Sequence, residues 1–163
     1  MKVFLKKYLG VIAAVAVFAL VCAALHAFVF HTVHIQGTSM VDTLRSGDIA
    51  LVTRMGTPER GDIVECSFPG RSGTYVKRLI GLPGEKIEII DSRVYVNGNA
   101  LSEPYASGPS EDYSLVLQEG EYLVLGDNRS ESYDSRAEDM GPVCRENLLG
   151  QVRLVLWPFK KIS

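Results

Sequence analysis

Two residues of this sequence, Ser39 and Lys77, have types and surroundings that could together cleave an amide bond. Ser39 follows a β-prone segment and lies two residues after Gly37, where the backbone can approach another group closely. Lys77 lies within residues 74–80, a β-prone run in which Tyr75 and Leu79 would share its strand face. Apolar neighbours exclude water from an amine and lower its pKa, which favours the neutral form that accepts a hydroxyl proton. Taken singly, Ser39 also fits an ordinary turn and Lys77 an ordinary surface position.

The sequence lacks the residues that other common catalytic mechanisms require. All three histidines, His26, His31 and His34, come early, so residues 35–163 contain none. A Ser-His-Asp triad or a zinc site would have to recruit a ligand from this early segment. The chain contains neither a GxxxxGK[ST] nor a GxGxxG phosphate-binding motif. We therefore expect no metal and no cofactor, and a lysine or a carboxylate as the base of any hydrolytic site.

Charge and cysteine content narrow the class of protein. Only three of the 17 basic residues precede the apolar N-terminal run, which leaves 14 against 19 acidic residues in the rest. An acidic domain of this kind is not typical of nucleic-acid binding. The three cysteines form no disulfide framework, and the sequence leaves open whether Cys66 and Cys144 meet. The length of 163 residues fits one domain, which we expect to be monomeric.

Residues 8–30 form an apolar run of 23 positions without a formal charge. As a helix it would be about 35 Å long, enough to cross a hydrocarbon core of about 30 Å. Lys2, Lys6 and Lys7 precede the run, and the next basic residue is Arg45. The positive-inside rule then predicts a cytoplasmic tail of residues 1–7, a single transmembrane anchor of residues 8–30, and residues 31–163 on the outer face of the cell membrane. The alternative is a cleaved leader, although the run exceeds the usual ~7–15 apolar residues.

The exported part is predicted to be mainly β, as an antiparallel, partly open, barrel-like domain, because short β-prone runs alternate with turn residues. The expected strands are residues 32–36, 48–54, 63–68, 74–80, 86–90, 93–96, 122–125 and 151–157. Asp91-Ser92 predicts a tight hairpin and residues 97–99 the next turn. Residues 102–118 predict an irregular excursion, and residues 145–149 a helical turn.

Three sequence blocks resemble the motifs of type I signal peptidases, in the same order and with similar separations. Ser39-Met40-x-x-Thr43-Leu44 is similar to the box that carries their nucleophile. The run from Lys77 to Glu85, KRLIGLPGE, is similar to the box that carries their general base. The third block is Gly126-Asp127-Asn128-Arg129 with Ser132 and Asp134-Ser135-Arg136. The resemblance covers nearly the whole exported domain, and the short length with one anchor resembles the form common in Gram-positive bacteria.

This resemblance implies a serine endopeptidase that removes signal peptides from exported preproteins through an acyl-enzyme, after small residues at the −3 and −1 positions. It implies Ser39 as the nucleophile, Lys77 as the general base and Ser132 as the residue that orients the lysine. A supporting network of ion pairs is implied for the remaining charged residues of the motifs, which are Asp127, Arg78, Asp134 and Arg136. As isolated surface pairs, these would contribute only ~0–1 kcal/mol each.

The sequence departs from the family pattern at two positions near Ser39. Some family members use a serine hydroxyl as a second oxyanion donor at the position of Gly37, so another donor must replace it here. Asp42 replaces the usual proline. We expect the Asp42 carboxylate to face solvent, because next to Lys77 it would favour the protonated amine.

Signal peptides and the lipid bilayer are the expected partners. Small residues need shallow apolar pockets, and the best candidates for the pocket walls are Val33, Ile35, Leu44 and Val76, with simple core packing as the alternative. Two other functions remain open, a self-cleaving repressor-type Ser–Lys protease and a catalytically silent β domain that binds partners. The N-terminal anchor argues against the first of these.

Overall fold

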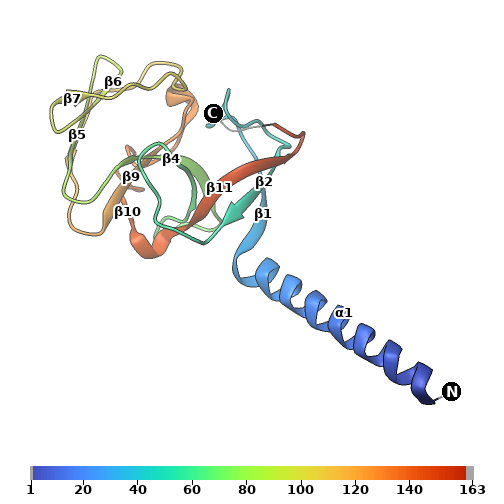
Figure 1. Cartoon of the computed structure of the whole chain (residues 1–163). Coiled ribbons are helices and arrows are strands. Elements are labelled where there is room, and N and C mark those ends of the chain that lie inside the picture. Colours follow the sequence, from blue (N-terminus) through green and yellow to red (C-terminus); the bar gives the residue numbers. More distant parts are fainter. Residues whose placement is uncertain (1, 161–163) are drawn as a thin grey trace.

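A long N-terminal helix leads into a β domain in the computed structural model, which describes residues 2–160, without the side chains of residues 2–7 and 25–28. The helix α1 (Lys2–Phe28) projects away from the domain (Figure 1), and only Val29 separates it from the first strand, β1 (Phe30–His34). Phe30, which the apolar run included, therefore belongs to β1. Residues 8–24 of α1 are all exposed. Among residues with described side chains, no helix has both the length and the hydropathy that crossing a bilayer requires.

The domain is built from two antiparallel sheets, so the prediction of a mainly β, antiparallel fold is confirmed. The larger sheet curves into a half-barrel (Figure 1), with the strand order β1, β2 (Ile49–Thr53), β11 (Leu148–Trp157), β3 (Ile63–Cys66), β4 (Tyr75–Gly81), β9 (Glu121–Leu125) and β10 (Val143–Cys144). The smaller sheet has the order β7 (Asn99–Ala100), β6 (Arg93–Val96), β5 (Lys86–Ile90) and β8 (Tyr113–Val116). Two 3-10 helices, η1 (Arg129–Glu131) and η2 (Arg145–Asn147), complete the described elements.

Each of the eight expected strands overlaps an observed one. The tight hairpin predicted at Asp91-Ser92 is also confirmed. Asp91 and Ser92 both have positive φ, 48° and 65°, in the tight turn between β5 and β6. The expectation of an irregular segment at residues 102–118 was wrong in part, because β8 forms there and pairs with β5. The four residues of β8 are flanked by polar residues, so the sequence pattern does not mark them as a strand. They form one because they pair with an edge of β5 that would otherwise be free.

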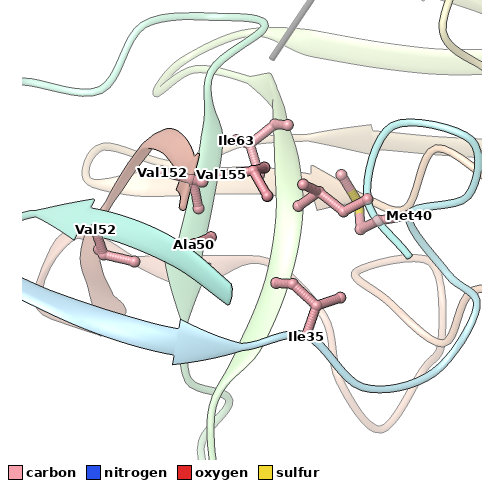
Figure 2. Close-up of a cluster of buried hydrophobic side chains, with 8 residues drawn as sticks. Ile35, Met40, Ala50, Val52, Ile63, Val152 and Val155 are labelled. Atoms are coloured by element: carbon pink, nitrogen blue, oxygen red, sulfur yellow. The ribbon is translucent and has the colours of Figure 1, made fainter. Parts of the chain in front are cut away.

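The inner side of the half-barrel holds the core cluster that fixes the segment around Ser39. Its members are Ile35, Met40, Leu44, Ala50, Val52, Ile63, Val152 and Val155. Figure 2 shows Ile35 and Met40, which precede and follow Ser39 in sequence, packed with side chains from the strands. Both are at most 5% exposed. Because burial of large apolar side chains stabilises the fold by about 1.5–3 kcal/mol each, this segment is held firmly on either side of Ser39.

Candidate active site

A cleft of about 360 Å³ lies between β1 and β4 and contains both Ser39 and Lys77. Its lining comes from the end of β1 and the turn that follows, together with the start of β4. These residues are Val33, His34, Ile35, Gln36, Gly37, Ser39, Met40, Thr74, Tyr75, Val76 and Lys77. A larger hollow of about 500 Å³ is lined by Ser132, Arg129 and Arg136 among others, and it includes neither Ser39 nor Lys77. The smaller cleft is therefore the candidate active site.

Both walls of the cleft include strand edges without a neighbouring strand. β1 is the first strand of its sheet and pairs only with β2. In β4, Tyr75 to Lys77 pair with β3 on one side, whereas pairing with β9 on the other side begins at Arg78. Unpaired backbone N–H and C=O groups on such edges can accept an additional extended chain. The cleft is thus shaped for a peptide in β conformation.

Lys77 is buried and hydrogen-bonded at the base of the cleft. It is 3% exposed, and its Nζ donates to Ser132 Oγ at 2.9 Å. Ser132 Oγ in turn donates to Asp134 Oδ2 at 2.6 Å. Burial lowers the pKa of Lys77 and outweighs the opposite effect of the Asp134 carboxylate. A neutral amine held in this way keeps a lone pair available to accept a proton.

The Ser39 segment is held against the third motif by backbone contacts. Asn128 N–H donates to Ser39 O at 3.0 Å, and Asn128 Nδ2 donates to Thr38 O at 3.3 Å. A Cβ atom on Gly126 would lie 2.2 Å from Ser132 Oγ and 2.5 Å from Ser39 O. Only a residue without a side chain allows this approach, so Gly126 brings Ser132, and with it Lys77, close to the backbone of Ser39.

The side chain of Ser39 makes no hydrogen bond to any residue within the described range 2–160, and its backbone N–H likewise has no acceptor there. Lys77 donates its hydrogen bond to Ser132, so no bond joins Ser39 to Lys77 in this structure. Catalytic hydrogen bonds are often long in the absence of substrate and shorten when it binds. Ser39 therefore presents a free hydroxyl and a free amide donor to the same cleft.

A buried ion pair connects all three sequence blocks. Arg78 contacts Asp127 through two hydrogen bonds, Nε to Oδ1 at 2.9 Å and Nη2 to Oδ2 at 2.7 Å. The side chains are 5% and 0% exposed. Thr43 Oγ1 donates to Asp127 Oδ2 at 2.5 Å, and the Arg78 guanidinium lies 3.8 Å from the ring centre of Tyr105. The pair thus ties the block that contains Ser39 to the strand that carries Lys77.

A second ion pair, between the partly exposed Arg136 and the buried Asp134, supports Ser132. Arg136 binds Asp134 through Nε at 2.8 Å and Nη2 at 2.9 Å, and the N–H of Gly126 donates to the same carboxylate at 2.9 Å. Burial alone would raise the pKa of Asp134, but the hydrogen bonds from Arg136, Ser132 and Gly126 lower it below its usual range. Asp134 is therefore held as a carboxylate that orients Ser132.

Several residues that support the site could not be identified from the sequence. Arg129 was part of the third block, but its partner Glu103, at 2.6 Å, lies in the segment expected to be irregular. Thr43 lies in the block that contains Ser39, but the sequence alone assigns it no role. A buried arginine requires an acceptor, but which of 19 acidic residues supplies it depends on tertiary structure.

The expected pocket walls divide into two groups. Val33, Ile35 and Val76 line the cleft. Leu44 does not line the cleft; it is fully buried in the core cluster, because it points inward from the turn after Ser39. Its expected place in the pocket is thereby corrected.

The two departures from the family pattern lie in exposed positions. The Asp42 carboxylate faces solvent, as expected, and accepts a hydrogen bond from Arg45 at 3.3 Å. Gly37 has φ of +85° and lines the cleft. Cys66 and Cys144 are both free thiols, and burial raises the pKa of Cys66 to about 12.

If Lys77 acts as a general base, its lowered pKa predicts how the activity depends on pH. Only the neutral amine accepts a proton, so kcat/KM should rise with pH through the pKa of Lys77. Because burial lowers that pKa, the midpoint should lie clearly below the ~10.4 of a free lysine. The measurement is kcat/KM for one peptide between about pH 6 and 11, with circular dichroism to verify folding. A midpoint at the value of free lysine would contradict a buried base.

Comparisons with known proteins agree with this geometry. The sequence model of the family "Signal peptidase, peptidase S26" matches residues 8–157. The chain is 34% identical over 165 residues to signal peptidase I of Bacillus licheniformis, covering 91% of this chain and 88% of that protein. It is 33% identical over 182 residues to signal peptidase IB of Staphylococcus aureus, covering 97% and 94%.

A crystal structure of a signal peptidase I from Enterococcus faecalis resembles this fold, with a TM-score of 0.54 and 36% identity, covering 60% of this chain and 97% of that one. The family-model match, over residues 8–157, includes the segments that carry the cleft and the buried ion pairs. The chain belongs to the signal peptidase family, peptidase S26, and is a serine endopeptidase.

Proposed function

We propose that this protein removes signal peptides from exported preproteins, with Ser39 as the nucleophile and Lys77 as the general base. The observation that supports this most strongly is the buried Lys77 amine, which is hydrogen-bonded to Ser132 at 2.9 Å and opens into the cleft that holds Ser39. A lysine that is 3% exposed and has no direct carboxylate partner among residues 2–160 has no evident structural purpose. Its environment suits proton transfer.

The chemistry would proceed through an acyl-enzyme. Lys77 Nζ takes the proton of Ser39 Oγ while that oxygen attacks the carbonyl carbon of the scissile bond. The protonated amine then donates to the leaving nitrogen as the C–N bond breaks, which leaves an ester on Ser39. A water that gives its proton to the neutral Lys77 hydrolyses the ester and restores the Ser39 hydroxyl. Ser132 holds the amine in position throughout.

The oxyanion of each tetrahedral intermediate requires hydrogen-bond donors. The N–H of Ser39, which has no acceptor within residues 2–160, is the first of these. Gly37 supplies no hydroxyl, so the second donor is a backbone N–H, the exposed Thr38 or a water. A missing donor costs ~10²–10³ in rate where the site depends on it.

The substrate is proposed to bind as an added strand between β1 and β4, with small side chains at −1 and −3 entering the cleft. Val33, Ile35 and Val76 are apolar walls that favour small uncharged residues. Two free edges provide backbone hydrogen bonds that do not depend on side chains. This explains how preproteins of different sequence could share one site.

We propose further that α1 anchors the chain in the cell membrane with a single pass and places the β domain on the outer face. The run of residues 8–30 carries no formal charge, and residues 8–24 are exposed on a helix that projects from the domain (Figure 1). Three lysines, at positions 2, 6 and 7, precede the run, and the next basic residue after it is Arg45, which favours a cytoplasmic N-terminus.

Membrane vesicles test activity and orientation together. Right-side-out vesicles that contain the full chain should cleave an added peptide with alanine at −3 and −1, and inverted vesicles should cleave it only after detergent is added. Mass spectrometry of the products locates the cut. No cleavage in detergent would exclude the proposed function, whereas equal cleavage by both vesicle types would exclude only the proposed orientation.

A further inference from the structure

A short segment outside the three sequence blocks, residues 103–107, contacts the turn of the third block. The segment lies between β7 and β8. Its Glu103 binds Arg129 through two hydrogen bonds, from Nη2 to Oε1 at 2.6 Å and from Nη1 to Oε2 at 3.1 Å. The two side chains are only 7% and 2% exposed. Neither takes part in the proposed mechanism, although both are almost fully buried.

Arg129 connects this carboxylate to the carbonyl group of Gly126. Its Nε donates to Gly126 O at 3.0 Å, while its Nη atoms bind Glu103. Because the guanidinium group is planar and rigid, a carboxylate that holds both Nη atoms also determines where Nε points. Glu103 therefore acts on the position of Gly126 through Arg129.

Tyr105 links the same carboxylate to the buried pair of Arg78 and Asp127. Its hydroxyl donates to Glu103 Oε1 at 3.1 Å, and its ring centre lies 3.8 Å from the Arg78 guanidinium. Burial and the neighbouring Glu103 carboxylate raise the pKa of Tyr105, so the hydroxyl stays protonated and remains a donor. The segment thus also reaches the Asp127 carboxylate, through Arg78.

Backbone hydrogen bonds join the segment to the same turn. The N–H of Ser107 donates to Asp127 O at 2.8 Å, and the N–H of Arg129 donates to Ser107 O at 2.7 Å. Ser107 and Asn128 also form an isolated parallel β-bridge. One segment therefore holds the turn by main-chain and side-chain contacts together.

The position of this turn affects how Ser39 and Lys77 lie relative to each other. The N–H of Asn128 donates to Ser39 O at 3.0 Å. Gly126 lies so close to Ser132 Oγ and to Ser39 O that a Cβ atom would not fit. Ser132 in turn binds the Lys77 amine. A displaced turn would therefore change the distance between the hydroxyl and the amine, and a misplacement of ~1 Å can lower a rate by ~10²-fold.

We propose that Glu103 is a positioning residue of this enzyme, which holds the 126–128 turn through Arg129 and so keeps Ser39 and Lys77 in register. The inference rests on the proposed function and adds a residue to it. Glu103→Ala should lower kcat by about 10²-fold. KM should stay within a factor of about three, because the walls of the cleft come from β1, β4 and the residues beside them and do not include this turn.

The test separates positioning from stability. The full-length chain in detergent cleaves a peptide with alanine at −3 and −1, well below its melting temperature, and thermal unfolding is followed in parallel. The double variant Glu103→Leu/Arg129→Met removes both buried charges, so it should recover much of the melting temperature lost in Glu103→Ala. Its kcat should nevertheless stay low, because Gly126 O has still lost the donor that Arg129 supplied.

Val143→Ala controls for a loss of stability alone. Val143 is fully buried in an apolar cluster on β10, so the cavity should lower the melting temperature. Its kcat should remain within a factor of about two, since the change lies away from the turn. A kcat that recovers with the melting temperature in the double variant would overturn the inference. So would a loss of kcat in Glu103→Ala no larger than in Val143→Ala.

Glu103→Gln keeps the test valid if Glu103→Ala does not fold. Glutamine retains the shape of the side chain and one acceptor oxygen, but it loses one of the two charged hydrogen bonds to Arg129. Its kcat should fall about tenfold with KM unchanged. A wild-type kcat in this variant would overturn the inference, whereas a wild type that does not cleave the peptide would refute the proposed function instead.

Discussion

Replacing Ser39 with alanine or Lys77 with methionine should each reduce kcat on a preprotein by at least ~10³-fold. Ser39→Ala removes the attacking oxygen, and Lys77→Met removes the proton acceptor while approximately keeping the length of the side chain. Because the two groups act in one proton transfer, the double variant should be no worse than either single variant. The rates can be measured by gel analysis of a purified precursor.

Two matched substitutions control for general effects on the fold. Ser46→Ala changes an exposed serine a few residues after Ser39, and Lys86→Met changes a lysine whose side chain is 50% exposed. Both should leave the rate within a factor of about two, since surface changes usually have small effects on folding. Processing by Ser39→Ala or Lys77→Met at the wild-type rate would refute the Ser–Lys mechanism.

Lys77→Met should also increase stability at neutral pH. The pKa of Lys77 is lower in the folded protein than in the unfolded chain, so the unfolded chain binds more protons between the two values. The contribution of this amine to stability therefore decreases as pH falls toward the folded pKa and stays unfavourable below it. Methionine removes that cost and remains apolar in a buried position. The gain in stability and the loss of activity would arise from the same group.

Asp127→Ala should destabilise the protein by about 3–5 kcal/mol, because it leaves the Arg78 guanidinium buried without its carboxylate. The hydrogen bond from Thr43 to the same carboxylate would also be lost. For a chain of this size the melting temperature should fall by roughly 10 °C or more. Catalysis should decline too, since the pair ties the Ser39 turn to the strand that carries Lys77. Thermal unfolding with a parallel activity assay measures both effects.

The exposed pair of Asp42 and Arg45 provides the control. It is also an aspartate–arginine pair, but its side chains are 81% and 68% exposed, so Asp42→Ala should change the melting temperature little. The double variant Arg78→Met/Asp127→Leu removes both charges and should recover much of the stability lost in Asp127→Ala. If Asp127→Ala and Asp42→Ala have equal effects, the buried pair does not hold the two motifs together.

The sequence predicts those features of the structure that depend on residues a few positions apart in the chain. The central strands were found because alternation and turn residues act over a few positions, as in β5, Asp91-Ser92 and β6. Lys77 stood out for the same reason, since its apolar neighbours Tyr75 and Leu79 lie two positions away. β8 escaped notice because four residues, paired only with β5, carry a weak signal.

Contacts between segments that are far apart in the sequence could not be predicted. The partner of Arg129 is Glu103, 26 residues away in a loop. His31 and Glu65 are 34 positions apart and meet only because the sheet curves. Leu44 illustrates the limit for single side chains: the pattern shows an apolar residue near Ser39, but only the path of the turn decides that it faces the core rather than the cleft.

Because only one residue separates α1 from β1, the distance from the helix to Ser39 is limited. If α1 lies in the bilayer as proposed, no flexible tether intervenes, and the eleven residues 29–39 can extend at most ~40 Å from the end of the helix to the nucleophile. The scissile bond would then be selected by its height above the lipid as well as by its sequence. Such a molecular ruler would ignore matching sequences located deep within a mature protein, and lengthening the junction should shift which site is cut.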